Sequence, residues 1–173
     1  MGERAVLAAI VGMLLSFVAG CAGSSSQEQQ KAYTPNIDPT EFTTTIDNEY
    51  FPMEPGTTFV YQGGAQHSEM TVTSDTTQVM GVECVVVDHK EWEGDMLIER
   101  THDWFAQDKK GAVWCFGEDT KEYENGEVVS TKGSWEAGVD GAKPGIIMQA
   151  HPKVGQSYHQ EYYPGGRPWT WLE

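Results

Sequence analysis

The residue with the clearest chemical potential is Cys21, because its thiol stands where a long apolar run ends. Arg4 places a positive charge near the N-terminus, and residues 5–19 are uncharged and mostly apolar. A run of this length is typical of an export signal and is short for a membrane span. The small Ala19 and Gly20 would let an extended chain enter a peptidase cleft. The adjacent thiol could then act as a nucleophile that accepts a lipid group.

The four residues Val18-Ala19-Gly20-Cys21 resemble the lipobox of bacterial lipoproteins. This resemblance implies cleavage between Gly20 and Cys21 and a diacylglyceryl group on the Cys21 sulfur. Each buried methylene contributes about 0.8 kcal/mol, so two or three acyl chains hold a protein on a bilayer more firmly than one. We expect a lipoprotein signal peptide at residues 1–20, with the membrane as the partner of the lipid on Cys21. The alternatives are an ordinary cleaved signal peptide and an uncleaved membrane helix.

The predicted location is the cell envelope, on the extracytoplasmic face of a bacterial membrane. Ala22 follows the cysteine, and in a Gram-negative cell a residue other than Asp there implies delivery to the outer membrane. The formal net charge of -15 argues against a nucleic-acid partner and against direct adhesion to anionic lipid headgroups. Lipid, rather than surface charge, would therefore hold the protein at the membrane.

The other residues that could do chemistry form no recognisable motif. The carboxylates are dense but lack the loop spacing of a calcium site. Serine-nucleophile, phosphate-loop and dinucleotide motifs are absent. We therefore predict no catalytic residue and no enzyme, the alternative being an envelope hydrolase with two carboxylates far apart in sequence. We expect no metal and no cofactor, since the histidines lack ligand spacing: His67, His89, His102, His151 and His159.

Turn signals separate short β-rich runs at intervals of roughly 8–12 residues, which is typical of an all-β domain. We interpret residues 21–46 as a flexible tether and residues 47–173 as the β-rich domain. The fold predicted is an antiparallel meander that forms a curved half-barrel, a barrel or a sandwich, after an N-terminal signal helix and a disordered tether. Strands are expected at 57–62, 66–74, 76–80, 82–92, 95–107, 112–117, 120–124 and 127–131, with short strands at 133–136, 145–148 and 158–163.

The turns predict how the strands pair. Asn125-Gly126 is typical of a type I′ hairpin turn. A two-residue turn at 93–94 and a four-residue turn at 108–111 would place Cys84 opposite Asp103 and Trp104 opposite Cys115. Since side chains alternate along a strand, the two cysteines would then point to opposite faces and stay unpaired. A single bulge would change this register, so a disulfide between Cys84 and Cys115 remains the alternative.

The same registers place His89 and His102 on one face and pair Phe105 with Trp114. The chain is rich in aromatic residues, with six Trp, six Phe and seven Tyr. Core packing is the commoner role of such residues in strands. The alternatives are to line an apolar ligand cavity or to form a stacking platform for sugar rings. The candidates for facing a ligand are Trp92, Trp104 and Trp114.

Three stretches carry a resemblance to a family of β-rich bacterial lipoproteins and secreted envelope proteins. They are DNEYFPMEPGTTFVY, DWFAQDKKGAVWCFGEDTKEYENGEVVSTKGSWEAGVDGAKPGIIM and HPKVGQSYHQEYYPG, within residues 47–165. The resemblance implies an envelope location and identifies no catalytic or binding residue. In turn style only, the chain is similar to curved-sheet envelope proteins that hold a lipid or a lipoprotein chain.

The C-terminus departs from the family, whose members continue with further strands after the YYPG segment. Residues 166–173 do not have a strand pattern, so we expect a truncated or frameshifted reading frame and an incomplete β domain. The function predicted is that of a membrane-anchored extracytoplasmic lipoprotein with a non-catalytic β domain that binds an apolar or lipidic ligand. A structural or partner-binding envelope lipoprotein without a small-molecule ligand is the first alternative, and the hydrolase is the second.

Overall fold

The computed structural model describes residues 33–164 and 171–172, so the predicted signal peptide and Cys21 lie outside the described residues. Within that description, no helix has the length and apolar character to cross a membrane. One 3-10 helix, η1 (Pro39–Glu41), precedes the strands. The strands are β1 (Phe42–Thr43), β2 (Thr58–Gly63), β3 (Gln66–Val79), β4 (Val82–Glu93), β5 (Met96–Asp108), β6 (Val113–Glu124), β7 (Glu127–Ser130), β8 (Trp135–Glu136), β9 (Lys143–Met148), β10 (Tyr158–His159), β11 (Glu161–Tyr162) and β12 (Trp171–Leu172).

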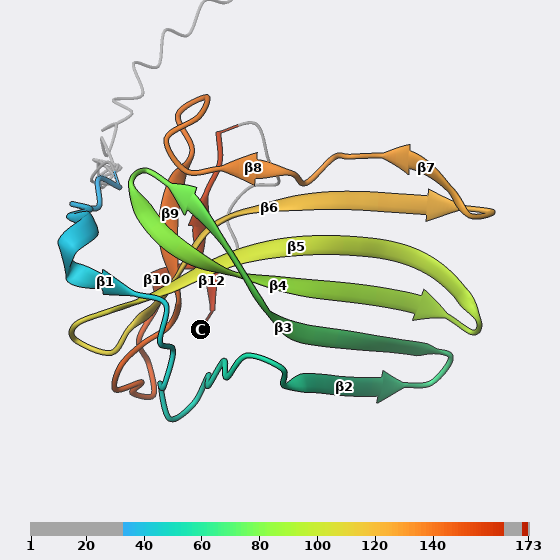
Figure 1. Ribbon diagram of the computed structural model, residues 1–173, viewed down its shortest axis with the longest axis horizontal. Coiled ribbons are helices and arrows are strands. Elements are labelled where there is room, and N and C mark those ends of the chain that lie inside the picture. The colour runs from blue at the N-terminus through green and yellow to red at the C-terminus, as the bar shows by residue number, and fades with distance from the viewer. Residues whose placement is uncertain (1–32, 165–170, 173) are drawn as a thin grey trace, which may run out of the picture. The chain divides into compact units, whose positions relative to one another are not determined.

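One curled antiparallel sheet dominates the structure, with strands in the order β11-β9-β6-β5-β4-β3-β2 (Figure 1). β1 pairs with β5, and both β7 and β8 pair with β6. β10 and β12 form a separate two-stranded sheet. The predicted all-β antiparallel meander is therefore confirmed, in its curved half-barrel form.

The curled sheet buries a hydrophobic cluster on each face. Cys84 and Ala106 belong to the first cluster, whereas their chain neighbours Val85 and Phe105 belong to the second. Because consecutive side chains of a strand point to opposite faces, the clusters lie on opposite sides of the sheet. Burying one Val or Phe side chain contributes about 1.5–3 kcal/mol. The first cluster is Val79, Val82, Cys84, Ala106, Phe116, Trp135, Ala137 and Ala142, and the second is Ile46, Met53, Val72, Val85, Val87, Phe105 and Val113.

Residues 33–46, predicted as the end of the tether, instead pack on the domain. Phe42 packs against the first cluster, and Ile46 is buried in the second. β1 pairs with the end of β5, where the Gln107 side chain accepts hydrogen bonds from the backbone N–H groups of Asp47 and Asn48, at 3.1 and 2.9 Å. The predicted boundary between tether and domain at residue 46 was therefore wrong. The apolar residues of this segment are spaced irregularly between polar ones, so the sequence shows no strand or helix pattern there.

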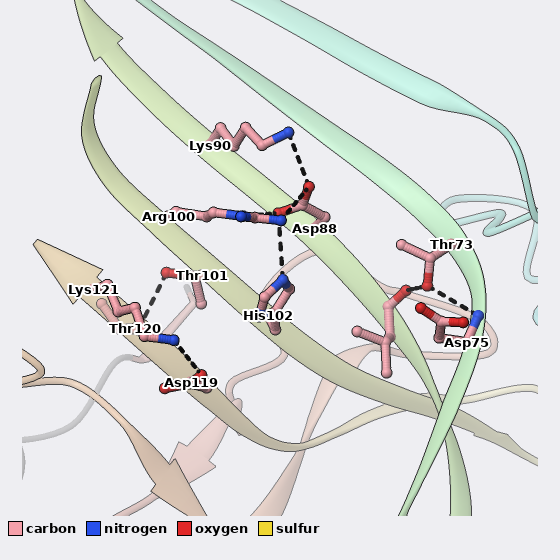
Figure 2. A network of polar contacts seen from close by, with 11 residues as sticks. Thr73, Asp75, Asp88, Lys90, Arg100, Thr101, His102, Asp119, Thr120 and Lys121 are labelled. Carbon is pink, nitrogen blue, oxygen red and sulfur yellow. Dashed lines mark hydrogen bonds and ion pairs between the residues drawn. The ribbon is translucent and has the colours of Figure 1, made fainter. Parts of the chain in front are cut away.

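The central strands are longer than predicted, because residues that resembled turns are accommodated as β-bulges. The runs 66–74 and 76–80 join into β3, whose register shifts between Val72 and Thr76. Thr73 braces this bulge (Figure 2): its hydroxyl donates to the Val86 carbonyl at 2.6 Å and accepts from the Asp75 N–H at 3.1 Å. Bulges bend a strand and increase its twist, which favours the curl of the sheet.

The Asn125-Gly126 hairpin is confirmed, since both residues have the positive φ of a type I′ turn, 53° and 82°. The turn predicted at 93–94 lies one residue later, between Glu93 and Met96. A bulge between Glu91 and Trp92 shifts the register again. Beyond it, the pairing of β4 with β5 differs from the predicted pairing by three residues in total. An odd displacement exchanges the two faces of a strand.

The predicted face of the histidines was therefore wrong. His102 lies opposite Asp88, and His89 lies opposite Thr101, so the two histidines point to opposite faces. Asp103 lies opposite Val87 rather than Cys84.

The β5–β6 register also differs from the prediction. Phe105 pairs with Cys115 rather than Trp114, and Trp104 pairs with Gly117, because the ladder shifts between Trp104 and Phe105. Both described cysteines, Cys84 and Cys115, are free. The expectation that they stay unpaired is confirmed, although the register that suggested it was wrong.

Gly117 is the most crowded glycine of the central strands, and it has a φ of 145°. A Cβ built there would lie 2.4 Å from the Trp135 carbonyl oxygen and 2.8 Å from Cε3 of Trp104. The predicted end of a strand at this glycine is instead a point where the backbone of β8 and an indole ring approach β6 closely. Only a residue without a side chain allows that approach.

We expect Gly117→Ala to lower the free energy of unfolding by about 3 kcal/mol or more, because Cβ would displace Trp104 and β8. Gly126→Ala is the matched control, since Gly126 also has a positive φ but its Cβ would meet nothing within 4 Å. Gly126→Ala should lower the free energy of unfolding by only about 1 kcal/mol. Urea denaturation measures both, and equal losses would contradict the proposed crowding.

Candidate functional site

A ladder of charged side chains covers one face of the sheet where β4, β5 and β6 run side by side (Figure 2). Asp88 is its centre and accepts from Arg100 Nε at 2.7 Å and Nη2 at 3.3 Å. Lys90 Nζ lies 2.9 Å from the same carboxylate, and His102 Nε2 lies 3.6 Å away. Burial opposes the ionisation of Asp88, but the hydrogen bonds from Arg100 and Lys90 outweigh it and hold its pKa below the usual range.

The register explains why the ladder needs its carboxylates. Lys90, Arg100 and Lys121 stand directly opposite one another on three adjacent strands, and like charges in that position are destabilising. Asp88 offsets the first two cations, and Asp119 lies 2.8 Å from Lys121. Exposed ion pairs contribute only about 0–1 kcal/mol each, so the ladder mainly favours this register. Its cations already have partners, which makes it a poor anion-binding site.

Two carboxyl groups meet on the opposite face of the same strands. Asp103 and Glu118 are directly opposite each other on β5 and β6, and each carboxyl group shifts the pKa of the other. Two facing carboxyl groups with little solvent around them favour keeping a proton over carrying two negative charges. Both side chains are partly exposed at the surface, yet protein atoms crowd the carboxyl groups themselves.

Burial has the largest effect on this acid pair. Burial, followed by the charge of Glu99, raises the pKa of Asp103 to about 7. Burial, the charge of Asp103 and then that of Glu161 raise the pKa of Glu118 to about 8. The Trp135 indole lowers the pKa of Glu118 slightly. That interaction falls short of a full bond, since the buried Nε1 of Trp135 has no hydrogen-bond partner among the described residues.

The geometry of the acid pair limits its chemistry. Glycoside hydrolases hold their two carboxyl groups about 5 Å or more apart so that the substrate can lie between them. Asp103 and Glu118 are neighbours on paired strands and protein atoms crowd both carboxyl groups, which leaves little room for a substrate between them. The neighbouring Cys115 thiol is no better suited to catalysis, because burial and the charge of Asp103 raise its pKa well above the usual value. The pair can hold a proton near neutral pH.

The three tryptophans predicted to face a ligand do not share one site. Trp104 lies against Gly117, and Trp114 donates from Nε1 to Asp108 at 3.0 Å. Both rings pack against the first hydrophobic cluster. Trp92 lies at the far end of β4, beside the turns at the free ends of the strands.

Trp92 is part of a surface hollow of about 280 Å³, formed where β2, β3, β4 and β5 end. Its ring stacks on the His67 ring, with centroids 4.5 Å apart and planes 3° from parallel. No sequence pattern connects His67 with Trp92, because the contact exists only across the β3–β4 register. The hollow is lined by Tyr61, Gln62, Gly63, Gln66, His67, Ser68, Glu91, Trp92 and Ile98.

Two of the other histidines, His89 and His102, each lie near a carboxylate. His89 Nε2 is 3.6 Å from Glu91, and His102 belongs to the charge ladder. Over the described ranges, no three His, Cys, Asp or Glu side chains gather as ligands for a metal ion. The His159 ring packs against Tyr33 with centroids 4.3 Å apart and planes tilted by 44°, and burial lowers the pKa of His159.

No family model, curated protein or solved structure matches the chain. The resemblance of its segments to envelope lipoproteins therefore stays a prediction.

The acid pair predicts a specific dependence of stability on pH. The pKa values of Asp103 and Glu118 in the folded state lie above their usual values of 3.8 and 4.5. The contribution of the two carboxyl groups to the free energy of unfolding is therefore fully present below about pH 4. It is lost as the pH rises through about 7 to 8. Glu118→Gln reproduces the neutral form of Glu118 and should remove part of this loss. We expect the variant to be about 2 kcal/mol more stable than the wild type near pH 8.5 and equal to it near pH 4.

Thermal or urea unfolding across this pH range measures the effect. Glu124→Gln is the control, because Glu124 is exposed at the end of the same strand and its loss removes the same charge. A Glu118→Gln variant that loses stability with pH as steeply as the wild type would show that the pair does not hold a proton.

Proposed function

We propose that this protein is an exported lipoprotein whose β domain binds a partner molecule at the outer face of a membrane without catalysing a reaction. The observation that carries the proposal is the sequence Val18-Ala19-Gly20-Cys21 at the end of the apolar run at 5–19. A thiol in that position is the acceptor for lipid in bacterial lipoproteins, and its acyl chains supply the membrane affinity.

The position of the domain along the chain agrees with this anchor. The described part begins at Tyr33, which packs on the domain by donating a hydrogen bond to the Pro144 carbonyl at 2.8 Å. Residues 22–32 separate it from Cys21. A stretch of that length extends at most about 40 Å. Lipid on Cys21 would therefore keep the domain near the bilayer.

The nucleophiles and acids of the domain support a non-catalytic role. Burial raises the pKa of the Cys84 thiol to about 12, which keeps it protonated and unreactive. Burial raises the pKa values of Asp103 and Glu118, so this pair keeps a proton near neutral pH, and protein atoms crowd both carboxyl groups. The hollow around Trp92 instead presents groups suited to binding.

We expect the wild-type chain to incorporate an alkyne-tagged fatty acid in a bacterial host and to partition into the membrane fraction. Cys21→Ala should lose both the label and the membrane association, because no acceptor thiol remains at the cleavage site. Cys84→Ala is the matched control, since Cys84 is buried in the first cluster, and it should keep the label. Label retained in Cys21→Ala, or absent from the wild type, would contradict the anchor.

The apolar or lipidic ligand expected from the sequence remains a prediction. The hollow is lined by amide, hydroxyl and carboxylate groups as well as by rings, which favours the partner-binding alternative over an acyl-chain cavity. Native mass spectrometry of the gently purified chain checks this choice. We expect no co-purified lipid besides the acyl chains on Cys21. A bound lipid found in several expression hosts would restore the apolar-ligand function.

A further inference from the structure

Strand β2 forms a free edge of the curled sheet (Figure 1). It stands at the end of the strand order, beside β3, and no other strand in the described ranges pairs with its outer side. All of its residues except Phe59 are exposed, and the large Val60 and Tyr61 are 63% and 57% exposed. The outer side of an edge strand presents backbone N–H and C=O groups that can pair with a strand of another chain.

The pairing with β3 identifies the backbone groups that point outward from β2. The N–H and C=O of Val72 on β3 bond Thr57 and Gly56, at 2.9 and 2.8 Å. Every second residue along an antiparallel ladder bonds in this way, so the residues of β2 that bond β3 are Phe59, Tyr61 and Gly63. The N–H and C=O groups that point away from the sheet belong to the residues between them, Thr58, Val60 and Gln62.

The edge strand also differs from the other long strands in its charge. Its sequence TFVYQG has no Asp, Glu, Lys or Arg, whereas every other described strand of six or more residues has at least one. Charged residues are a common protection of sheet edges against pairing, and β2 lacks them. In a chain of net charge -15, a second copy can therefore approach this edge without placing like charges directly opposite each other.

The charges on the next strand are too distant to oppose that approach. Glu69 on β3 lies directly opposite Val60. In two sheets joined at β2, Glu69 and its copy would be three strand spacings apart, about 14 Å. Salt screens interactions beyond about 8 Å at physiological ionic strength.

We propose that two copies of the chain pair edge to edge through antiparallel β2 strands. A two-fold axis beside Val60 places this residue opposite its own copy and Thr58 opposite Gln62 of the second copy. Each of these pairs exchanges two hydrogen bonds, so all the outward groups of the strand are used. On the other face, Phe59 lies opposite Tyr61 of the second copy, and cross-strand aromatic pairs are stabilising. A shift of the register by two residues would leave one of the outward residues without a partner.

This arrangement closes after two copies. A two-fold contact uses the same surface on both chains, and β3 already covers the inner side of β2. The other end of the strand order is β11, which has only two residues and offers no comparable edge. The inference goes beyond the proposed function, because pairing requires no lipid on Cys21. Lipid there would nevertheless confine the copies to one membrane and raise their effective concentration.

Val60→Cys tests the register by cross-linking. The Cα atoms of a hydrogen-bonded antiparallel pair are about 5.5 Å apart, a distance that a disulfide spans. We expect mild oxidation of the full chain in detergent to give a covalent dimer with this variant and none with the wild type. Val139→Cys is the matched control, because Val139 is 48% exposed and lies between β8 and β9, away from the edge.

Sedimentation equilibrium of the full chain in a density-matched detergent measures the association itself. We expect a monomer–dimer equilibrium that Val60→Lys weakens about tenfold or more, because the two lysines would face each other. Val128→Lys is the control, since Val128 is 49% exposed on β7 and the change in charge is the same. Added salt should strengthen the wild-type dimer by screening the repulsion between two acidic chains.

The inference fails if the wild-type chain stays monomeric at about 0.5 mM, a concentration that reveals even weak pairing. The edge would then be left to a strand of a different protein. It also fails if Val128→Lys weakens association as much as Val60→Lys, or if Val139→Cys cross-links as efficiently as Val60→Cys. None of these results affects fatty-acid labelling of Cys21, so failure here is distinguishable from failure of the anchor.

Discussion

The register of β3, β4, β5 and β6, set by β-bulges, is the constraint on which the rest of the structure depends. The ladder shifts between Val72 and Thr76, between Glu91 and Trp92, and between Trp104 and Phe105. Each shift changes which side chains meet across the strands and adds twist to the sheet. A long sheet without such breaks would remain flatter and would not curl over its own hydrophobic clusters.

This register places groups of like charge beside one another on both faces, and the two faces accommodate them differently. On the more open face, Lys90, Arg100 and Lys121 are offset by the ionised Asp88 and Asp119. On the opposite face, Asp103 and Glu118 share a proton instead of recruiting a cation. Crowding by protein atoms explains the difference, since desolvation penalises the ionised form of a carboxyl group.

The proposed binding function depends on a different part of the same sheet. The hydrophobic clusters occupy the curled end, and the hairpin ends extend beyond them with Tyr61, Met96 and Val128 exposed. Side chains at those ends contribute little to the core and are therefore available for contacts with other molecules. A lipid anchor on Cys21 would place such a surface in the compartment outside the membrane without specifying what it binds.

The sequence by itself determined the all-β class and the Asn125-Gly126 hairpin, because both depend on local composition or on a few adjacent residues. It also indicated an export signal and the lipid-accepting position of Cys21, which stay predictions. Tertiary structure alone decided the strand partners, the packing of residues 33–46 and the contact between His67 and Trp92. A bulge leaves almost no local signal, yet it reverses the facing of every residue beyond it. The acid pair and the hollow therefore became visible only once the whole ladder was in place.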